Sequence, residues 1–298
     1  MDPATADERP IISIIIPTYN VESTIGAVLE SITTQTFRQY EVVIVDGVSK
    51  DGTAGIVARY AAGNPAIRWM QEKDEGIYDA MNKGVGLARG EWLYFLGADD
   101  TLYNDGVLQE VYDAAAGTAA DLIYGNVMIR GSNMWGNDGQ LYDGEFNRAK
   151  LFRSNISHQA IFYRSRVFRS VGLFDLRYKS CADWDLNHRC FARLQTHYFP
   201  STIANFQTGG ASTQLAVDLF LEKESVIRLK EYYKLSYFHR LFDNSSWQFW
   251  NVSNDLLTEK RYFRSFIFFI YAAYHSKKKI GLLKNYLINL YSGFRKTV

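Results

Sequence analysis

The sequence predicts an α/β fold with a mostly parallel central sheet, and three observations lead to this prediction. Apolar runs of strand length recur through the first third of the chain. Segments with apolar residues at helical spacing separate these runs, an alternation typical of right-handed crossover connections. Polar residues follow the runs, at the edge where ligands bind in open sheets of this class.

The most informative strand is the unbroken apolar run Trp92–Leu96, which leads through Gly97 and Ala98 to Asp99 and Asp100. Such a run is expected to be buried on both faces of a parallel sheet. Two adjacent carboxylates repel each other unless a cation lies nearby, so one interpretation is a Mg²⁺ or Mn²⁺ site shared with a phosphate group. The other is a solvated turn in which one aspartate caps the next helix.

Three further strands and three helices are expected before this run. The strands cover Ile11–Ile16, Glu41–Asp46 and Ile67–Met70. The helices cover Ile25–Ile32, Thr53–Ala62 and Ile77–Ala88, the first with Asn20 or Ser23 as its cap. Thr18, Tyr19 and Asp46 would then share one edge of the sheet with the two aspartates, because parallel strands end at the same edge.

The sequence lacks a glycine-rich phosphate loop. The first strand is not followed by Gly-x-Gly-x-x-Gly, and Gly-Lys-Ser/Thr is absent, which argues against a dinucleotide-dependent dehydrogenase and a P-loop enzyme. A sugar-nucleotide nucleotidyltransferase usually carries a glycine-rich loop with Arg or Lys after its first strand, and Thr18–Thr24 has neither. The carboxylates at the sheet edge would instead bind ribose hydroxyls and a metal that holds a diphosphate.

The next hundred or so residues carry further strands and one helix with an acidic start. Strands are expected over Asp121–Ile129, Ile161–Tyr163 and Thr202–Phe206, with a loop rich in Gly and Asn over Gly131–Gly144. Trp184, Asn187, Cys190, Phe191 and Leu194 share a helical face, which places Asp183 at the start of that helix. The Asp183 carboxylate suits the positive end of the helix dipole, and capping of the helix is one interpretation of its position.

The C-terminal part of the chain is expected to be helical, aromatic and basic. Helices are predicted over Leu219–Leu235, Trp247–Leu257, Tyr262–Tyr274 and Ile280–Phe294. From Lys260 to Val298 there are nine Lys or Arg and no Asp or Glu, and the last helix has Leu283, Tyr286, Leu287, Leu290 and Tyr291 on one face. One interpretation is a helix lying on an anionic membrane surface. The alternative is a helical pair packed on the preceding domain or on a second subunit.

Length, charge and cysteine content bound the class of protein. The 298 residues suit one large α/β domain, or one domain plus an appendage, and 33 basic against 32 acidic residues leave no global field for nucleic acid. Cys181 and Cys190 have no metal-site spacing, which indicates a reducing compartment. The polar start of the chain is not a signal peptide, and no stretch reaches the roughly 18 apolar residues of a membrane span. A cytoplasmic protein is expected.

Four blocks of the sequence, taken in order, resemble the signatures of family 2 glycosyltransferases. The blocks are Ile14–Asn20, Glu41–Asp46 with Asp51–Thr53, Asp74–Gly84 and Phe95–Asp100. The resemblance extends over roughly residues 11–213, and the block Gly76–Gly84 is most similar to bacterial enzymes that build surface polysaccharides, such as colanic acid and O-antigen transferases.

This resemblance implies the GT-A fold and an inverting transfer with Mn²⁺ or Mg²⁺. The donor would be a nucleotide-diphosphate sugar and the acceptor a hydroxyl of a glycan or a polyprenyl-linked glycan. Residues 1–213 would form the catalytic domain, with a donor half at about 11–100 and an acceptor half at about 101–213. Residues 214–298 would be a helical extension that contacts the inner face of the plasma membrane peripherally.

On the donor side, each role is carried over from the resemblance. Pro17, Thr18 and Tyr19 would line the base and ribose, with Asp46 beside them, and Asn82 would shape the donor pocket. Asp100 would bind the metal, and Asp99 the ribose or sugar, with metal binding as its alternative role. Gly47 replaces a second aspartate that often reads a uracil edge, so the resemblance does not fix the base, and Gly97 replaces a frequent Asp.

On the acceptor side, Asp183 matches the general base of the family, with Ala182 in place of the neighbouring acid. An inverting transfer needs one such base to take the proton of the acceptor hydroxyl, and Asp185 is the second candidate. His158, Gln159 and Trp184 are the candidate acceptor contacts, although His158 could equally be a structural histidine. A nucleotidyltransferase and a non-catalytic nucleotide-sugar-binding protein of the same fold remain the alternative functions.

Overall fold

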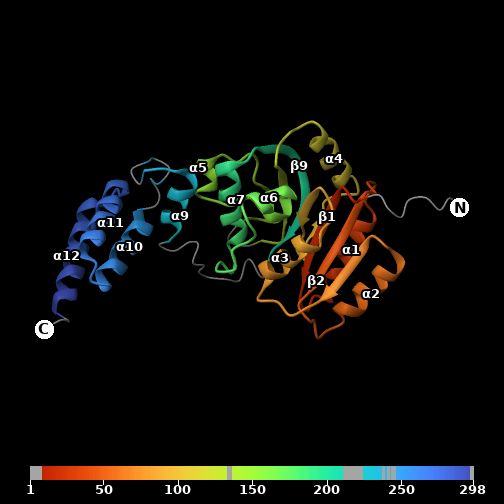
Figure 1. Ribbon diagram of the computed structural model, residues 1–298, viewed down its shortest axis with the longest axis horizontal. Helices are drawn as coiled ribbons and strands as arrows, with labels where there is room; N and C mark the ends of the chain where they lie inside the picture. Colours follow the sequence, from red (N-terminus) through yellow and green to blue (C-terminus); the bar gives the residue numbers. More distant parts are fainter. Residues whose placement is uncertain are drawn as a thin grey trace. The chain divides into compact units, whose positions relative to one another are not determined.

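The computed structural model describes residues 9–132, 136–210, 224–236, 239, 242 and 246–295. The chain divides into two compact units, Met1–Leu215 and Ala216–Val298. The first contains the sheet and the second is helical (Figure 1). The assignment of catalysis to the first and membrane contact to the second stays a prediction.

The sheet of the first unit has nine strands in the described part of the chain. They are β1 (Ile12–Thr18), β2 (Tyr40–Asp46), β3 (Ile67–Gln71), β4 (Trp92–Phe95), β5 (Thr101–Leu102), β6 (Leu122–Arg130), β7 (Leu141–Tyr142), β8 (Ile161–Arg164) and β9 (Thr196–Gln207). Their order is β3-β2-β1-β4-β8-β6-β9-β5, and β7 pairs with β6. β1 to β4 pair in parallel, whereas β8 runs antiparallel to both β4 and β6. The predicted α/β class and mostly parallel sheet are confirmed.

Helices connect the strands and cover the sheet. In the first unit they are α1 (Ile25–Thr33), α2 (Thr53–Gly63), α3 (Ile77–Leu87), α4 (Val107–Ala116), α5 (Arg148–Leu151), the 3-10 turn η1 (His158–Ala160), α6 (Arg166–Ser170) and α7 (Ala182–Arg193). Helix α3 packs on β1 and β2 so closely that a Cβ at Gly84 would overlap the side chain of Ile15. This contact fixes α3 against the strands whose carboxyl ends carry the site.

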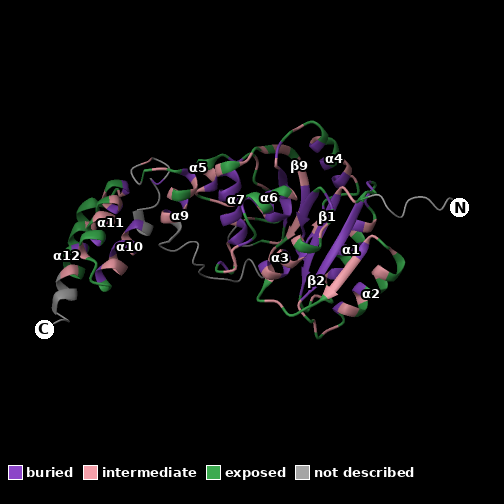
Figure 2. Cartoon of the chain, viewed as in Figure 1, coloured by how far each residue is buried: buried purple, intermediate pink, exposed green. Residues whose placement is uncertain are grey.

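The core of the first unit lies in the sheet. All residues of β1, β2 and β4 are buried, as the unbroken apolar runs predict (Figure 2). Glu41, near the amino end of β2, is a charged residue that is buried among these mostly apolar strands. It accepts hydrogen bonds from Ser13 and Arg89 and forms an ion pair with Arg68. Although burial acts to raise it, these partners leave the pKa of Glu41 below its usual value.

The second unit contains α9 (Glu224–Tyr233), α10 (Ser246–Thr258), α11 (Tyr262–His275) and α12 (Lys279–Arg295). Leu257, Phe269 and Tyr286 form the centre that α10, α11 and α12 share. Ser253 and Ser265 join α10 to α11, because each hydroxyl donates to the other residue's carbonyl oxygen. The predicted C-terminal helices are present, although residues 219–223 of the first lie outside the described residues. Within the described residues, no helix combines the length and apolarity that a membrane span needs.

Candidate active site

The acidic pair Asp99 and Asp100 follows β4 at the carboxyl edge of the sheet. Asp100 is 1% exposed; its Oδ1 accepts a hydrogen bond from the backbone N–H of Gln207 (2.8 Å) and its Oδ2 one from Gln159 Nε2 (2.5 Å). Burial, and then the charge of Asp99, raises the pKa of Asp100 to about 7. Burial also raises the pKa of Asp99. The fold therefore holds two carboxylates whose negative charges it compensates only in part.

Gly97 makes room for this pair. A Cβ at position 97 would overlap Asp100 Oδ2 and lie 3.0 Å from Asp99 Oδ1, so both carboxylates turn back over the glycine backbone. A Cβ at Gly210, in the turn after β9, would likewise overlap Asp99 Oδ2. The glycine that departs from the family pattern at position 97 is thus a steric requirement of this arrangement.

The acidic pair suits a hard divalent cation whose coordination a substrate completes. Carboxylate oxygens are the ligands that Mg²⁺ and Mn²⁺ prefer, and Mg²⁺ is commonly held by one or two carboxylates together with substrate phosphates. In the part of the chain that the structure describes, no three His, Cys, Asp or Glu side chains are grouped closely enough to hold a metal by themselves. Asp99 and Asp100 therefore fit a metal that is shared with a phosphate group.

Two consecutive residues of η1 join the acidic pair to Asp183. Gln159 donates to Asp100, and its own position is fixed by hydrogen bonds from Ser157 Oγ (2.5 Å) and Tyr94 OH (2.9 Å). His158 Nδ1 lies 3.8 Å from Asp183 Oδ2. His158 Nε2 is buried and has no hydrogen-bond partner among the described residues. Such a nitrogen is costly unless a ligand or water meets it, which favours a substrate contact over a purely structural histidine.

Asp183 lies in the first turn of α7 and is 7% exposed. Its Oδ1 accepts a hydrogen bond from Tyr78 OH and its Oδ2 one from Asn155 Nδ2, both at 2.8 Å. The cap position of the helix is Cys181, so Asp183 is not the capping residue. The carboxylate still benefits from the positive end of the helix dipole.

The second candidate base, Asp185, faces a different partner. It is 1% exposed and forms an ion pair of 2.8 Å with Arg189, one helical turn further on. Arg189 also donates to the carbonyl oxygens of Val171 and Leu173, which ties α7 to the chain before it. This geometry favours a structural role for Asp185 and leaves Asp183 as the candidate base.

Asp46 has its carboxylate fully engaged within the protein. Its Oδ1 accepts from Thr18 Oγ1 (3.0 Å) and Ser49 Oγ (2.5 Å), and its Oδ2 from Ser49 N (2.9 Å) and Gln71 Nε2 (3.0 Å). Although burial acts to raise it, these four hydrogen bonds leave the pKa of Asp46 below its usual value. This geometry is compatible with the predicted place of Asp46 beside the ribose. The four hydrogen bonds nevertheless favour a role for Asp46 in holding the ends of β1 and β2 together.

Asp74 lies beside position 47, where the resemblance leads one to expect a second aspartate. A Cβ at Gly47 would lie 2.5 Å from Asp74 Oδ2 and 3.3 Å from Cδ2 of Tyr19. Tyr19 is 56% exposed at the end of β1, so its ring is available to a nucleotide base. A carboxylate therefore stands beside the predicted base site after all, although it comes from the segment between β3 and α3.

The remaining predicted residues shape the site from within. Asn82 donates to the carbonyl oxygen of Phe174 (2.9 Å) and accepts from its N–H (3.0 Å), which ties α3 to the chain before α7. Trp184 donates from Nε1 to the carbonyl oxygen of Leu151 (2.7 Å). Pro17 is buried within β1 opposite Val45. All three act on the position of other elements in this structure.

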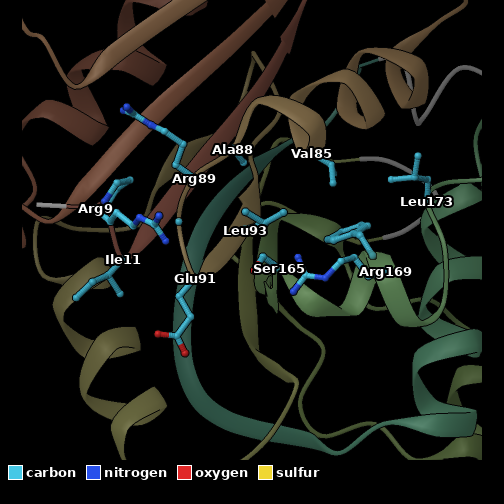
Figure 3. A pocket seen from close by; sticks show the side chains of 13 residues that line it. Arg9, Ile11, Val85, Ala88, Arg89, Glu91, Leu93, Ser165, Arg169 and Leu173 are labelled. Carbon is cyan, nitrogen blue, oxygen red and sulfur yellow. The ribbon is translucent and has the colours of Figure 1, made fainter. Parts of the chain in front are cut away.

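A cavity of about 820 Å³ lies away from all of these residues, near the amino ends of β1 and β4. Figure 3 shows Arg9, Arg89 and Arg169 among its lining side chains. The predicted site residues line none of it, and ligands of open α/β sheets bind at the opposite, carboxyl ends of the strands. We therefore place the candidate active site at Asp99, Asp100, His158 and Asp183.

Comparisons with known proteins show the family. The model of glycosyl transferase family 2 matches residues 13–172. A PGL/p-HBAD biosynthesis glycosyltransferase of Mycobacterium tuberculosis is 44% identical over 223 residues, which cover 72% of this chain and 84% of that protein. A chondroitin synthase of Escherichia coli is 30% identical over 194 residues, which cover 62% of this chain and 27% of that protein.

Solved structures show the same fold. S. aureus TarS 1-349 in complex with UDP-GlcNAc matches with a TM-score of 0.63 at 20% identity, over 74% of this chain and 66% of that one. The mannosyltransferase PcManGT from Pyrobaculum calidifontis, in complex with GDP-Man and Mn²⁺, matches with a TM-score of 0.52 at 19% identity, over 67% and 57%. The chain therefore belongs to glycosyl transferase family 2 and is a glycosyltransferase with the GT-A fold.

Proposed function

We propose that this glycosyltransferase moves a sugar, with inversion, from a nucleotide-diphosphate sugar to a hydroxyl of a glycan or lipid-linked acceptor. The observation that carries the proposal is the pair His158–Gln159, whose side chains reach Asp183 and Asp100 respectively. The donor-side carboxylates and the candidate base therefore belong to one site. The nucleotide sugars in complex with two solved neighbours, UDP-GlcNAc and GDP-Man, support the donor class.

The donor would lie across the carboxyl ends of β1, β2 and β4. Tyr19 offers an exposed ring to the base, Asp74 offers a carboxylate beside it, and Asp46 keeps Thr18 and the following loop in place. Asp99, less buried than Asp100, is free to take a hydroxyl of the ribose or sugar. Asp100 would hold Mn²⁺ or Mg²⁺, with Asp99 as a second ligand in the alternative arrangement, and the metal would supply positive charge against the negative charge on the departing diphosphate.

The acceptor hydroxyl would be deprotonated by Asp183. A single carboxylate base suffices for an inverting transfer, because the hydroxyl attacks the sugar from the face opposite the leaving group. The unpartnered Nε2 of His158 is placed to hydrogen-bond an acceptor or sugar oxygen next to this carboxylate. Gln159 and Trp184 fix neighbouring segments through their hydrogen bonds to Asp100 and to the carbonyl oxygen of Leu151. The relative named as a chondroitin synthase supports a glycan product.

The test is a transfer assay with UDP-GlcNAc, GDP-mannose and other nucleotide sugars in the presence of Mn²⁺. Nucleotide diphosphate release with sugar transfer is the expected reaction. Asp183→Asn should lower turnover by about 10³-fold or more, because the general base is lost, while UDP or GDP binding with Mn²⁺ is kept. Near-normal turnover of Asp183→Asn would remove this residue from its role.

We also propose that the second unit contacts an anionic membrane surface peripherally. Helix α11 exposes Phe263 (77%), Phe266 and Ile270 along one face, and the first turn of α12 contains Ile280, which is 88% exposed. An apolar groove of about 440 Å³ lies between these two helices. Exposed Lys277–Lys279 precede Ile280, and the absence of acidic residues after Glu259 makes this part of the sequence strongly basic.

Vesicle flotation tests this contact. The full chain should float with vesicles that contain phosphatidylglycerol, and removal of residues from Tyr262 onward should leave it in the soluble fraction. Phe263→Ser with Ile280→Ser should reduce binding about tenfold, because exposed apolar side chains supply the insertion energy. Leu141→Ser, at an exposed leucine of the first unit, is the matched control. Unchanged flotation of the double variant would contradict membrane contact.

A further inference from the structure

We propose that Tyr78 and Asn155 are positioning residues that orient the general base through two converging hydrogen-bond arms. One arm comes from helix α3 of the donor half, and the other passes through three residues of the acceptor half. This inference rests on the proposed role of Asp183 as the base. It adds two residues that neither the sequence motifs nor the family resemblance singled out.

The first arm is Tyr78. Its ring is buried and lies against Phe174, with ring centroids 5.4 Å apart, and its OH is 2.8 Å from Asp183 Oδ1 and 3.0 Å from the carbonyl oxygen of Ser180. The hydroxyl has one proton, and the charged carboxylate is the stronger acceptor of the two. Burial and the charge of Asp183 raise the pKa of Tyr78 well above its usual value, so the phenol stays protonated and remains a donor.

The second arm is a chain of three side chains that ends on the other carboxylate oxygen. Tyr163 OH donates to Asn187 Oδ1 (2.9 Å), Asn187 Nδ2 donates to Asn155 Oδ1 (2.8 Å), and Asn155 Nδ2 donates to Asp183 Oδ2 (2.8 Å). Tyr163 and Asn187 are fully buried. Each amide uses its oxygen to accept and its NH₂ to donate, so the chain has one direction and ends on the carboxylate.

The two arms act on different oxygens of the Asp183 carboxylate. One donor on each oxygen fixes the rotation of the carboxylate about its Cβ–Cγ bond, and a carboxylate has about four lone-pair positions, so each oxygen keeps capacity for a further partner. The base is therefore held in one orientation, with room for the acceptor hydroxyl.

The arms also connect the base to both halves of the domain. Tyr78 lies on α3, which packs against β1 at Gly84, and Tyr163 lies on β8, which pairs with β4. The strands that carry the donor site and the carboxylate that activates the acceptor thus share rigid supports. Such an orientation should matter in the transition state and not in donor binding, so it should appear in kcat and not in donor KM.

The experiment compares Tyr78→Phe and Asn155→Ala with the wild type in the full chain, using hydrolysis and transfer of UDP-GlcNAc or GDP-mannose with Mn²⁺. Each variant should lower kcat by about 10- to 100-fold while the donor KM stays within about twofold. A residue that merely supported the fold would lower the melting temperature without separating kcat from donor KM in this way.

Two buried residues of the same types serve as controls. Tyr124 exchanges hydrogen bonds with the backbone of Phe146, and Asn126 bonds Tyr198, Ser201 and Gly144. Tyr124→Phe and Asn126→Ala should lower the melting temperature but keep kcat within about twofold, since neither residue reaches Asp183. Wild-type kcat in Tyr78→Phe and Asn155→Ala would overturn the proposal, as would a loss of kcat matched by loss of donor affinity. Asp183→Asn distinguishes failure of this proposal from failure of the proposed function. If that variant is active, the assignment of Asp183 as the base is itself wrong.

Discussion

Asp46 and Asp100 are both carboxylates at the carboxyl edge of the sheet, each 1% exposed, and the protein treats them in opposite ways. Asp46 accepts four hydrogen bonds, which leave its pKa below the usual value even though burial acts to raise it. Asp100 accepts two and lies beside Asp99, so burial and that neighbour raise its pKa to about 7. Burial alone does not identify a functional acid.

The difference lies in whether the fold or a ligand satisfies the charge. A carboxylate saturated by its own protein stabilises the fold, whereas one left short of donors next to a second carboxylate is an incomplete site. Asp46 positions the loop after β2 through its hydrogen bonds, whereas the charge of Asp100 is suited to a bound cation. This comparison makes three predictions, from the largest effect to the smallest.

The largest expected effect separates the two residues by turnover. Asp100→Asn should lower sugar transfer by about 10³-fold, because it removes a carboxylate from the proposed metal site. Asp46→Asn should cost about 2–3 kcal/mol of folding stability instead, since one amide NH₂ would face the donors of Ser49 and Gln71. Steady-state rates and urea unfolding measure the two quantities. Equal losses of turnover in both folded variants would abolish the distinction.

The second prediction concerns the pH dependence of stability without divalent ions. The pKa of Asp100 is raised from 3.8 to about 7, so the native state binds more protons than the unfolded chain in this range and loses stability as pH rises through it. The stability of the wild type relative to Asp100→Asn should therefore fall by up to about 4 kcal/mol between pH 4 and pH 8, whatever the pH-independent cost of placing an amide NH₂ opposite the donors of Gln159 and Gln207. Urea unfolding at pH 4 to 8 with EDTA measures this.

Asp46 should show the opposite sign in the same measurement. Its folded pKa is lowered from 3.8, so the stability that it contributes is present above that value and is lost as pH falls through the folded pKa. The wild type should therefore exceed Asp46→Asn at neutral pH and approach it in acid. A wild-type advantage over Asp100→Asn that grows with pH would reverse the interpretation of the pair.

The smallest expected effect is at Asp74, which stands beside Gly47 and Tyr19 without being buried. Asp74→Asn should change the affinity for UDP relative to GDP by about tenfold, because a carboxylate and an amide present different hydrogen-bonding groups to a base edge. Stability should stay within about 0.5 kcal/mol. Calorimetric titration with each nucleotide measures the ratio, and Asp105→Asn, at an exposed carboxylate just before α4, is the control. An unchanged ratio would exclude Asp74 from base selection.

The helices and strands with the strongest apolar patterns could be predicted from the sequence. The direction in which strands pair could not. β1, β2 and β4 follow from unbroken apolar runs, and α1, α2 and α3 from helical spacing. The antiparallel insertion of β8 between β4 and β6 could not be predicted, because an apolar run contains no information about its direction. Neither Asn20 nor Ser23 caps α1; the cap position is Thr24, and Asn20 Oδ1 accepts from the N–H of Lys50 instead.

The residues of the candidate site likewise fall into those that the sequence predicts and those that it does not. Asp99, Asp100 and Asp183 follow from motifs, because each lies at the end of a strand or the start of a helix that the sequence reveals. The roles of Tyr78 and Asn155 could not be predicted from motifs, because these residues contact Asp183 across sequence separations of 105 and 28 residues. The one available signal was that Tyr78 belongs to the block Gly76–Gly84, where a polar aromatic residue enters an otherwise small and apolar helix face.

The position of Asp74 beside Gly47 has a consequence for how nucleotide preference can change, if Asp74 contacts the base as proposed. A carboxylate attached to the end of β2 would be anchored in a strand that is buried along its whole length, so altering it would disturb the core. Here the corresponding oxygen sits on a short surface connection, Glu72–Gly76, between β3 and α3. Nucleotide preference could therefore drift, or be engineered, by grafting that connection alone, with the scaffold and its chemistry left untouched.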